Sequence, residues 1–509
     1  MFNKGIIYNQ DADSLLYGVG KNGCTLTVEE MENYASQFKG SHMTDIMLCL
    51  NNSCSTFPSK TRTSLVDKYH QKIENGIEVD YIGVASVAAA HHIYEVLGID
   101  HIEVEIRTFR EIGINPWISF RMNDFHDFHL PASPILPDFF HEHPEVRRVK
   151  YHPEFRTNNG DLNMDYTHQL VRDHMLSFIE ESLDRYDAYG VELDYTREIE
   201  VFANGYEYDG IEIMNQFVRD VYALCGKYGE KYGHKLKLAV RVAPGVEQNM
   251  DFGLNVMQWV QEGMIDLVTI AGRFESNDND MPIKLWKTLL TPYNVELAAG
   301  IEMNICPYMA HKPFGPTLDT FAACAANAYS QGADRIYFYN YYHPFQAEHI
   351  KADDSVSEST PNFHKGNVYS LLGDFEKTLK LDRRHIWSIN DRQPHWKRGR
   401  IVGSQLPVTL TRSVAFKITV GDIPEGAKVS VHMGYDDLEK AKANPPRIFV
   451  NSQECTYTGT EENHRTTAGT VCCYDVPATA HKSNIFVFII VNEETTVDYI
   501  EAYIKAPTE

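Results

Sequence analysis

The sequence predicts an α/β protein in which a (β/α)8 TIM barrel is followed by an all-β sandwich domain. Over the first three quarters of the 509 residues, short apolar runs alternate with amphipathic stretches, a pattern typical of such a barrel. From Trp396 onward, short alternating runs replace the helical periodicity. No glycine-rich phosphate loop follows an early strand, which argues against a doubly wound sheet. We therefore expect a barrel over residues 1–390 and a sandwich over residues 391–509.

The expected barrel strands are short runs bounded by turn residues and helical patterns. They cover residues 5–9, 45–51, 117–123, 190–194, 237–242, 267–271, 296–302 and 335–340. Amphipathic stretches predict helices over residues 27–38, 60–97, 108–112, 166–186, 211–232, 254–262, 283–290, 317–331 and 367–379. Each strand is thus followed by a helix before the next strand begins, as the barrel requires.

The C-terminal part of the chain predicts a small sandwich. Its alternating runs cover residues 413–419, 428–433, 447–450, 484–491 and 496–504, and residues 436–443 predict one inserted helical turn. Short strands separated by turn signals are typical of a β-sandwich. We interpret this region as an accessory domain that either flanks the cleft of the barrel or binds carbohydrate.

Charge and composition limit the partners that the protein can have. The net charge is −23, and no run is rich in Lys and Arg, so we expect neither nucleic acid nor an anionic membrane surface as a partner. A small-molecule or oligosaccharide substrate that is neutral or cationic fits this charge better. The sequence leaves a homo-oligomer open.

The N-terminus and the cysteines indicate the compartment. The N-terminal residues show no basic segment followed by an apolar stretch of signal-peptide length, and no later run is apolar enough to span a bilayer. The nine cysteines are scattered and form no C-x-x-C pair, so we expect reduced structural thiols rather than disulfides or a zinc cluster. Together these features predict a cytoplasmic protein.

The segment Gly-Val-Glu-Leu-Asp-Tyr-Thr-Arg-Glu at residues 190–198 combines a buried-strand pattern with charge at its end. Because side chains alternate along a strand, Glu192 and Asp194 share the face opposite Val191 and Leu193. Two carboxylates close together in a desolvated place raise the pKa of at least one of them, which acid/base chemistry requires. The alternative is that Glu192 is a salt-bridged barrel residue and Asp194 caps the next loop.

Polar side chains also end most of the other expected strands. In the third strand, Ile118, Phe120 and Met122 should face the helices, while Ser119, Arg121 and Asn123 face inward. The active site of a TIM barrel lies where its strands end, so we expect a site there. We predict that Asp194, Glu302 and Glu192 are catalytic. The expected substrate-binding residues are Arg121, Asn123, Asp124, His126, Arg197, Arg241, Tyr339 and Asn340.

The residue types at these strand ends favour glycoside hydrolysis. No G-x-S-x-G elbow is present and no lysine ends an expected strand, which argues against acyl transfer and Schiff-base chemistry. The histidines of residues 126–143 lie in a proline-broken segment without an H-E-x-x-H motif, so we expect no metal and no other cofactor. Carboxylates on separate strands can protonate a leaving oxygen and attack the anomeric carbon or activate water.

Three motifs carry a resemblance to a known family. Phe-Arg-Met-Asn-Asp at residues 120–124 with His126, Phe-Phe-His-Glu-His-Pro-Glu at 139–145 and Tyr-Gly-Val-Glu-Leu-Asp-Tyr-Thr-Arg at 189–197 resemble the glycoside hydrolase family 10-like TIM-barrel proteins. The resemblance covers roughly residues 5–379. It implies a retaining glycosidase with Asp194 as acid/base and Glu302 as nucleophile.

The sequence departs from that family at the fourth strand, which ends in Glu-Leu-Asp-Tyr where the related enzymes have an Asn-Glu pair. Glu192 and Glu198 are therefore rivals of Asp194 for the acid/base role. Another glycosidase pattern makes Asp194 the nucleophile and takes its acid from a later loop, where Glu275 or Asp278 could serve.

Two functions of other classes stay open. One is a barrel that binds carbohydrate without catalysis. The other is an isomerase or lyase that acts on a free sugar with a divalent metal held by Asp124, Glu192 and Asp194.

Overall fold

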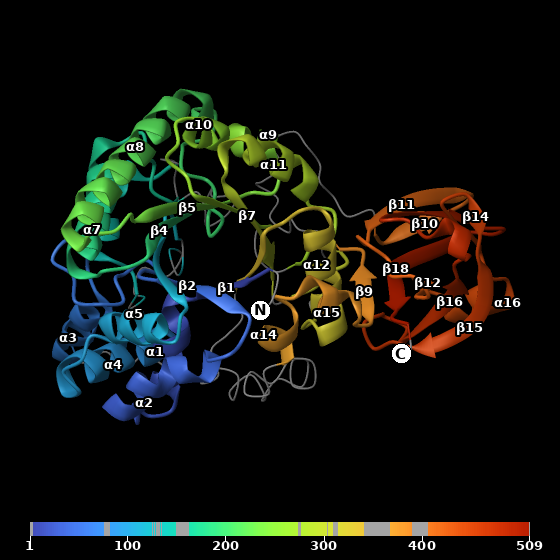
Figure 1. Ribbon diagram of the computed structural model, residues 1–509, viewed down its shortest axis with the longest axis horizontal. Coiled ribbons are helices and arrows are strands. Elements are labelled where there is room, and N and C mark those ends of the chain that lie inside the picture. The colour runs from blue at the N-terminus through green and yellow to red at the C-terminus, as the bar shows by residue number, and fades with distance from the viewer. Residues whose placement is uncertain are drawn as a thin grey trace.

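The computed structural model describes residues 4–75, 82–124, 126, 128, 133, 135–148, 162–272, 276–302, 304–308, 314–339, 367–388 and 406–507. It confirms the expected fold class: eight parallel strands close into a barrel, and the C-terminal strands form two antiparallel sheets. The barrel with its helices and the sandwich lie at opposite ends of the molecule (Figure 1).

The barrel strands follow one another in chain order around the ring, with the last beside the first. They are β1 (Ile6–Gln10), β2 (Met43–Cys49), β3 (Asn115–Arg121), β4 (Gly190–Asp194), β5 (Lys237–Val242), β6 (Leu267–Ile270), β7 (Glu296–Ile301) and β8 (Arg335–Phe338). Every expected barrel strand overlaps one of these. Along β3, Ile118 and Phe120 pack in the large core beneath the helices, whereas Trp117 packs inside the barrel with Ile7, Met47 and Tyr337, as the period of two requires.

The helices of the barrel region surround this ring (Figure 1). The α-helices are α1 (Ala12–Lys21), α2 (Val28–Asn33), α3 (Leu65–Asn75), α4 (Ile82–His91), α5 (His101–Glu111), α6 (Asp138–Glu142), α7 (Gln169–Arg185), α8 (Glu207–Tyr232), α9 (Val246–Asp251), α10 (Val256–Gln261), α11 (Ile283–Leu290), α12 (Leu318–Ser330), α14 (Asn367–Leu371) and α15 (Phe375–Leu379). Shorter helical turns are η1 (Tyr34–Phe38), η2 (His92–Val96), η3 (Pro144–Val146) and η6 (Thr291–Tyr293). Local signals set several ends: Thr27 and Glu30 form a capping box at α2, and Gly233 ends α8 with φ 75°.

Helix α1 is absent from the expected elements. Its two glycines lower its helix propensity, which weakens the pattern in the sequence. Gly20 is needed there because a Cβ atom would lie 2.0 Å from the carbonyl oxygen of Ala85 in α4. The close packing of α1 on α4 therefore requires Gly20, and the same glycine weakens the helical pattern of α1 in the sequence.

The sandwich strands form two sheets around a second apolar core. They are β9 (Arg383–Ile386), β10 (Val408–Leu410), β11 (Ser413–Thr419), β12 (Lys428–Tyr435), β13 (Arg447–Val450), β14 (Gln453–Glu454), β15 (Thr456–Glu462), β16 (Thr470–Asp475), β17 (Asn484–Ile490) and β18 (Thr495–Lys505), with helices α16 (Leu438–Ala443) and η9 (Ala478–Ala480) between them. One sheet has the order β10-β18-β12-β16-β15, with β9 also on β18, and the other has the order β11-β17-β13-β14. The expected strands and the helical turn are present, whereas β9, β10, β14, β15 and β16 are absent from the expected elements. The first three are short, and the mixed Thr, Gly, Cys and Glu residues of β15 and β16 give a weak alternation.

Polar contacts join the sandwich to the barrel. Arg384 of β9 donates to Asp319 of α12 at 3.0 Å, and Arg465 donates to Thr317 at 3.1 Å. Strand β9 pairs with β18 although it precedes residue 391. Residues 389–405 lie outside the described part of the chain, so the domain boundary at 390/391 stays a prediction.

Among the described residues, no helix is both long enough and apolar enough to cross a membrane.

Candidate active site at the carboxyl ends of the barrel strands

A row of polar side chains crosses the inner face of the barrel near the carboxyl ends of its strands. Arg121 of β3 is in register with Asp194 of β4, which is in register with Arg241 of β5, which is in register with Thr269 of β6. All four side chains are buried. Because the register alternates positive and negative groups, each charge faces an opposite charge on the neighbouring strand.

Asp194 is fixed by Arg241 and by its own loop. Arg241 Nη1 lies 2.9 Å from Oδ1 and 3.0 Å from Oδ2 of Asp194. Oδ1 also accepts hydrogen bonds from the backbone N–H groups of Thr196 at 3.0 Å and Arg197 at 3.2 Å. Asp194 is 1% exposed. It therefore caps the loop that follows β4, as the alternative interpretation of the sequence proposes, and it also faces a charged partner inside the barrel.

Glu302 lies on the other side of the same guanidinium. Its Oε1 is 3.7 Å from Arg241 Nη2, and the residue is 4% exposed. Asn277 holds the end of β7 in place, since it donates to the Glu302 carbonyl and accepts from the Glu302 N–H, each at 2.7 Å. Arg241 also stacks on Tyr339, with 3.6 Å between the guanidinium carbon and the ring centroid. One arginine thus joins the two carboxylates that the sequence predicts as catalytic.

Glu192 lies one layer below Asp194 on the same face of β4. Its Oε1 accepts hydrogen bonds from Ser119 Oγ at 2.7 Å and Tyr337 Oη at 2.9 Å. Burial and the nearby charge of Asp194 raise the pKa of Glu192 to about 7. This is the raised carboxyl pKa that the paired-carboxylate pattern predicts.

A second charged cluster surrounds Asp124. Its Oδ2 accepts from Arg121 Nη1 at 3.0 Å, and its Oδ1 is 2.5 Å from His126 Nδ1. Arg197 Nη2 lies 2.5 Å from His126 Nε2. Burial alone would raise the pKa of Asp124, but His126, Arg121 and Arg197 together hold it below its usual range. Arg121 also bonds Asp11, at 2.7 Å.

The remaining predicted residues differ in how the structure uses them. The side-chain amide of Asn123 donates to the carbonyls of Met164 and Glu200 at 3.0 and 3.1 Å, so it ties two loops together. Tyr339 is buried and points at Arg241, and its pKa is raised by burial. Asn340 lies outside the described residues.

Two of the other carboxylates that the sequence offers as the acid, Glu198 and Asp278, lie among the described residues. Glu198 is buried beside Arg197, and Asp278 Oδ1 accepts the N–H of Asp280 at 2.7 Å. Glu275 is not among the described residues. The sequence predicts that Ser119 faces inward, but it does not predict the bonds of Ser119 and Tyr337 to Glu192; the inward register of Tyr337 is the signal that could have identified it.

The metal-site alternative requires Asp124, Glu192 and Asp194 to converge. Asp124 and Asp194 each bind a different arginine, at 3.0 and 2.9 Å, and Glu192 accepts from two hydroxyls. The bonds of these carboxylates therefore go to cationic and neutral donors of the chain itself, an arrangement that does not suit a shared divalent ion.

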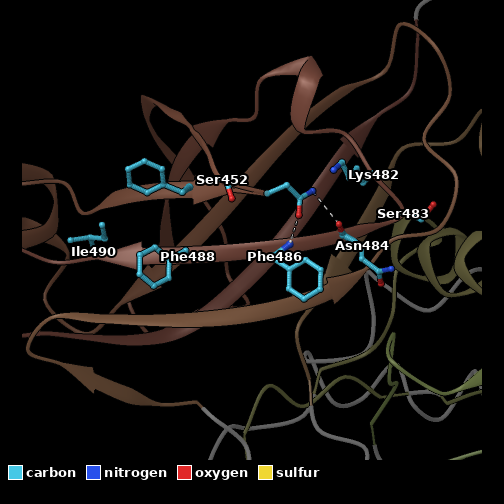
Figure 2. A pocket seen from close by; sticks show the side chains of 9 residues that line it. Ser452, Lys482, Ser483, Asn484, Phe486, Phe488 and Ile490 are labelled. Atoms are coloured by element: carbon cyan, nitrogen blue, oxygen red, sulfur yellow. Dashed lines mark hydrogen bonds between the residues drawn. The ribbon is translucent and has the colours of Figure 1, made fainter.

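A separate groove of about 790 Å³ lies on the outer face of the sandwich (Figure 2). Phe486 and Phe488 alternate with buried residues along β17 and are 53% and 41% exposed. Figure 2 shows polar side chains at one end of the groove, next to Phe486. The lining residues are Phe449, Asn451, Ser452, Lys482, Ser483, Asn484, Phe486, Phe488 and Ile490.

No family model and no curated protein sequence matches the chain. Solved structures are similar to it at low identity. The α-L-fucosidase isoenzyme 2 from Paenibacillus thiaminolyticus is 13% identical with a TM-score of 0.41, and the match covers 72% of this chain and 49% of that one. This chain thus spans about half the length of that structure.

Two further structures are similar in the same way. For the glycoside hydrolase domain of PgaB (BpsB) from Bordetella bronchiseptica, the identity is 10%, the coverage 72% and 99%, and the TM-score 0.40. The α-fucosidase of Thermotoga maritima in complex with fucose is 9% identical, with a TM-score of 0.36, and the match covers 96% of this chain and 96% of that one. Similarities at this level carry no argument about activity, and the resemblance to the family 10-like proteins stays a prediction.

Proposed function

We propose that the protein is a glycoside hydrolase whose reacting carboxylates are Asp194 and Glu302. The observation that carries this proposal is the position of Arg241, which lies 2.9 Å from Asp194 and 3.7 Å from Glu302. Carboxylates that project from separate strands at the carboxyl end of a barrel are the groups that glycosidic cleavage needs.

The hydrogen bonds favour the nucleophile role for Asp194, which the sequence leaves open beside the acid/base role; an acid at Glu302 is new to this proposal. Asp194 accepts hydrogen bonds from the Arg241 guanidinium and from the backbone N–H groups of Thr196 and Arg197, and these donors hold its oxygens in a fixed orientation. Its Oδ1 accepts several bonds, whereas Oδ2 accepts from Arg241 Nη1 and is the oxygen better placed to attack. We therefore assign Asp194 as the nucleophile and Glu302 as the acid/base, the reverse of the roles that the family resemblance implies.

The reaction then follows two steps. Glu302 gives its proton to the glycosidic oxygen as the bond to the leaving group breaks, and Asp194 Oδ2 forms a bond to the anomeric carbon. Glu302 next takes a proton from water, whose oxygen displaces Asp194 and releases the sugar. Arg241 stabilises the charge on Asp194 before the first step and after the second.

The surrounding residues have supporting roles in this proposal. The side chain of His126 is 35% exposed and can form a hydrogen bond with a sugar hydroxyl. Arg197 and Asp124 hold the imidazole ring in place. Glu192 lies beneath Asp194, and its pKa of about 7 means that Glu192 gains or loses a negative charge near neutral pH. The charge of Glu192 therefore changes the electrostatic potential at Asp194.

A panel of aryl glycosides with good and poor leaving groups tests both the function and the roles. Glu302→Gln should lose activity on poor leaving groups and keep most of it on good ones, because a good leaving group needs no proton. Asp194→Asn should be inactive on both. The opposite pattern would restore the roles implied by the family resemblance. Sugar binding without turnover by the wild-type protein would favour the non-catalytic barrel instead.

We propose a second, accessory function for the groove on the sandwich: binding of a saccharide. Phe486, Phe488 and Phe449 offer aromatic faces on which the apolar C–H face of a sugar ring can stack, and Ser452, Lys482 and Ser483 add hydrogen-bonding groups to the same groove. Apolar walls with a few polar groups are typical of ligand sites.

Affinity electrophoresis in gels that contain soluble polysaccharides tests this accessory function. The double variant Phe486→Ala with Phe488→Ala should lose any retardation that the wild-type protein shows, and Tyr208→Ala, which removes an exposed ring from α8, should keep it. Equal retardation of wild type and the double variant would refute the assignment.

A further inference from the structure

Four polar side chains form a row on one face of the larger sandwich sheet. In β12, His432 is in register with Glu501 of β18 on one side and with Cys473 of β16 on the other. Glu461 of β15 is in register with Val471, two residues from Cys473. Since side chains two apart share a face, Glu461 lies on the same side of the sheet as Cys473.

Three members of this row bring their donor atoms together. One ligand atom each of His432, Glu461 and Cys473 lies within 4.8 Å of the other two. His432 and Cys473 are 2% and 4% exposed, whereas Glu461 is exposed. The group is therefore a pair of buried donors with a carboxylate at the solvent side, where an ion could enter.

The fourth member, Glu501, orients the imidazole. Its Oε1 lies 2.9 Å from His432 Nδ1, and it is fully buried. Tyr499 donates to its Oε2 at 2.7 Å, and Arg384 binds its Oε1. A carboxylate that holds one nitrogen of a ligating histidine is the usual outer partner in metal sites. The other nitrogen, Nε2, lies 2.8 Å from the hydroxyl of Ser430, which can rotate away.

We propose that His432, Cys473 and Glu461 bind a divalent zinc-like ion, with water at the fourth position. Imidazole, thiolate and carboxylate are all zinc ligands, and zinc bonds of about 2.0–2.3 Å in a tetrahedral site place ligand atoms about 3.5 Å apart. The three donor atoms, which lie within 4.8 Å of one another, would therefore need only small side-chain movements to reach the spacing of a zinc site. Binding releases the thiol proton of Cys473 to solvent.

The position of the site indicates a structural role. Within the described part of the chain, strand β15 lies at the edge of its sheet and pairs with β16 alone, and most of its side chains are exposed. An ion held by Glu461, Cys473 and His432 would link β15 to two inner strands. Cys473 also packs with Ile305 and Phe314 of the barrel region, so the ion would stabilise the face that meets the barrel. This inference does not depend on the proposed glycosidase activity.

Cobalt provides the test, because Co²⁺ bound to a thiolate gives a charge-transfer absorption band. The full-length chain, reduced and freed of metal with a chelator, is titrated with Co²⁺ and then with Zn²⁺. We expect one Co²⁺ per chain with a thiolate band, and loss of the band as Zn²⁺ displaces the cobalt. Absence of the band in the wild-type protein would overturn the proposal.

Three variants assign the ligands. Cys473→Ser should remove the band, while the matched control Cys472→Ser should keep it, because Cys472 lies on the opposite face of β16, in the sandwich core. Glu461→Gln, at an exposed position that folding tolerates, should keep the band and weaken Co²⁺ binding at least about 10-fold. A band that persists in Cys473→Ser, or unchanged affinity in Glu461→Gln, would each contradict the site.

Discussion

The two ends of the barrel interior both contain buried ion pairs, but they are built differently. At the amino end, Asp45 accepts hydrogen bonds from Asn115 at 3.1 Å and Trp117 at 2.8 Å and binds Arg335. Arg335 also pairs with Glu296 at 2.9 Å. At the carboxyl end, Arg241 lies between Asp194 and Glu302.

The difference lies in which buried atoms find a partner. Among the described residues, several buried atoms at the carboxyl end have no hydrogen-bond partner: Arg241 Nε and Nη2, Tyr339 Oη, Thr269 Oγ1 and Glu192 Oε2. Among the described residues, no buried side-chain nitrogen or oxygen of Asp45 or of the residues bonded to it lacks a hydrogen-bond partner. Buried polar groups normally pair within the protein. The polar groups of the amino end are thus satisfied within the protein, whereas the carboxyl end, where we predict the site, leaves buried polar groups unsatisfied.

The largest expected effect is a loss of activity when the carboxyl end of the barrel is changed. Asp194→Asn should lower kcat by at least about 10³-fold, because a nucleophile is lost. The free energy of unfolding should also fall, because Arg241 is fully buried and Glu302 lies 3.7 Å from it. Steady-state kinetics and urea unfolding measure the two quantities. An active Asp194→Asn protein would end the hydrolase proposal.

The matched variant at the other end is Asp45→Asn. This change should lower the unfolding free energy by about 1–3 kcal/mol, because the buried carboxylate loses its charge while Arg335 keeps Glu296 at 2.9 Å. The kcat of the folded fraction should stay at the wild-type value. Urea denaturation together with active-site titration provides the test, and a large fall in kcat would show that the two ends are coupled.

The pH dependence of stability sharpens the comparison at Glu192. Its pKa is raised from 4.5 to about 7 in the folded state, so the native state binds a proton that the unfolded state lacks between these values. Stability from this group is therefore full below about pH 4.5 and is lost as pH rises through 7, by about 3 kcal/mol in total. The difference in unfolding free energy between wild type and Glu192→Gln should change by this amount between pH 4.5 and 8. A constant difference would contradict the raised pKa.

The smallest effect concerns Tyr339. Tyr339→Phe removes a buried hydroxyl that has no hydrogen-bond partner among the described residues and keeps the ring beneath Arg241. Stability should stay within about 1 kcal/mol of wild type or rise slightly. If the hydroxyl serves the substrate, kcat/KM should fall. Tyr337→Phe is the control, because its hydroxyl already bonds Glu192 and its loss should lower stability.

The fold could be predicted because the barrel strands follow a period of two and the helices between them a period near 3.6. The shared face of Glu192 and Asp194 followed from the same rule. The contact of Arg241 with Glu302 could not be derived, since it depends on how the ring brings β5 and β7 together. For the same reason Cys473 could not be related to His432 and Glu461, because the three residues come from three different strands with no local spacing motif. The domain boundary and the roles of the site residues stay predictions.

The place of β18 in its sheet has a consequence for synthesis. This late strand lies between β12 on one side and β9 and β10 on the other. The ring of eight strands is complete once β8 has been made, so it can close on the ribosome while the sandwich still lacks its middle strand. A nascent chain that stops short of residue 495 would therefore carry a finished barrel and an open, aggregation-prone sheet edge.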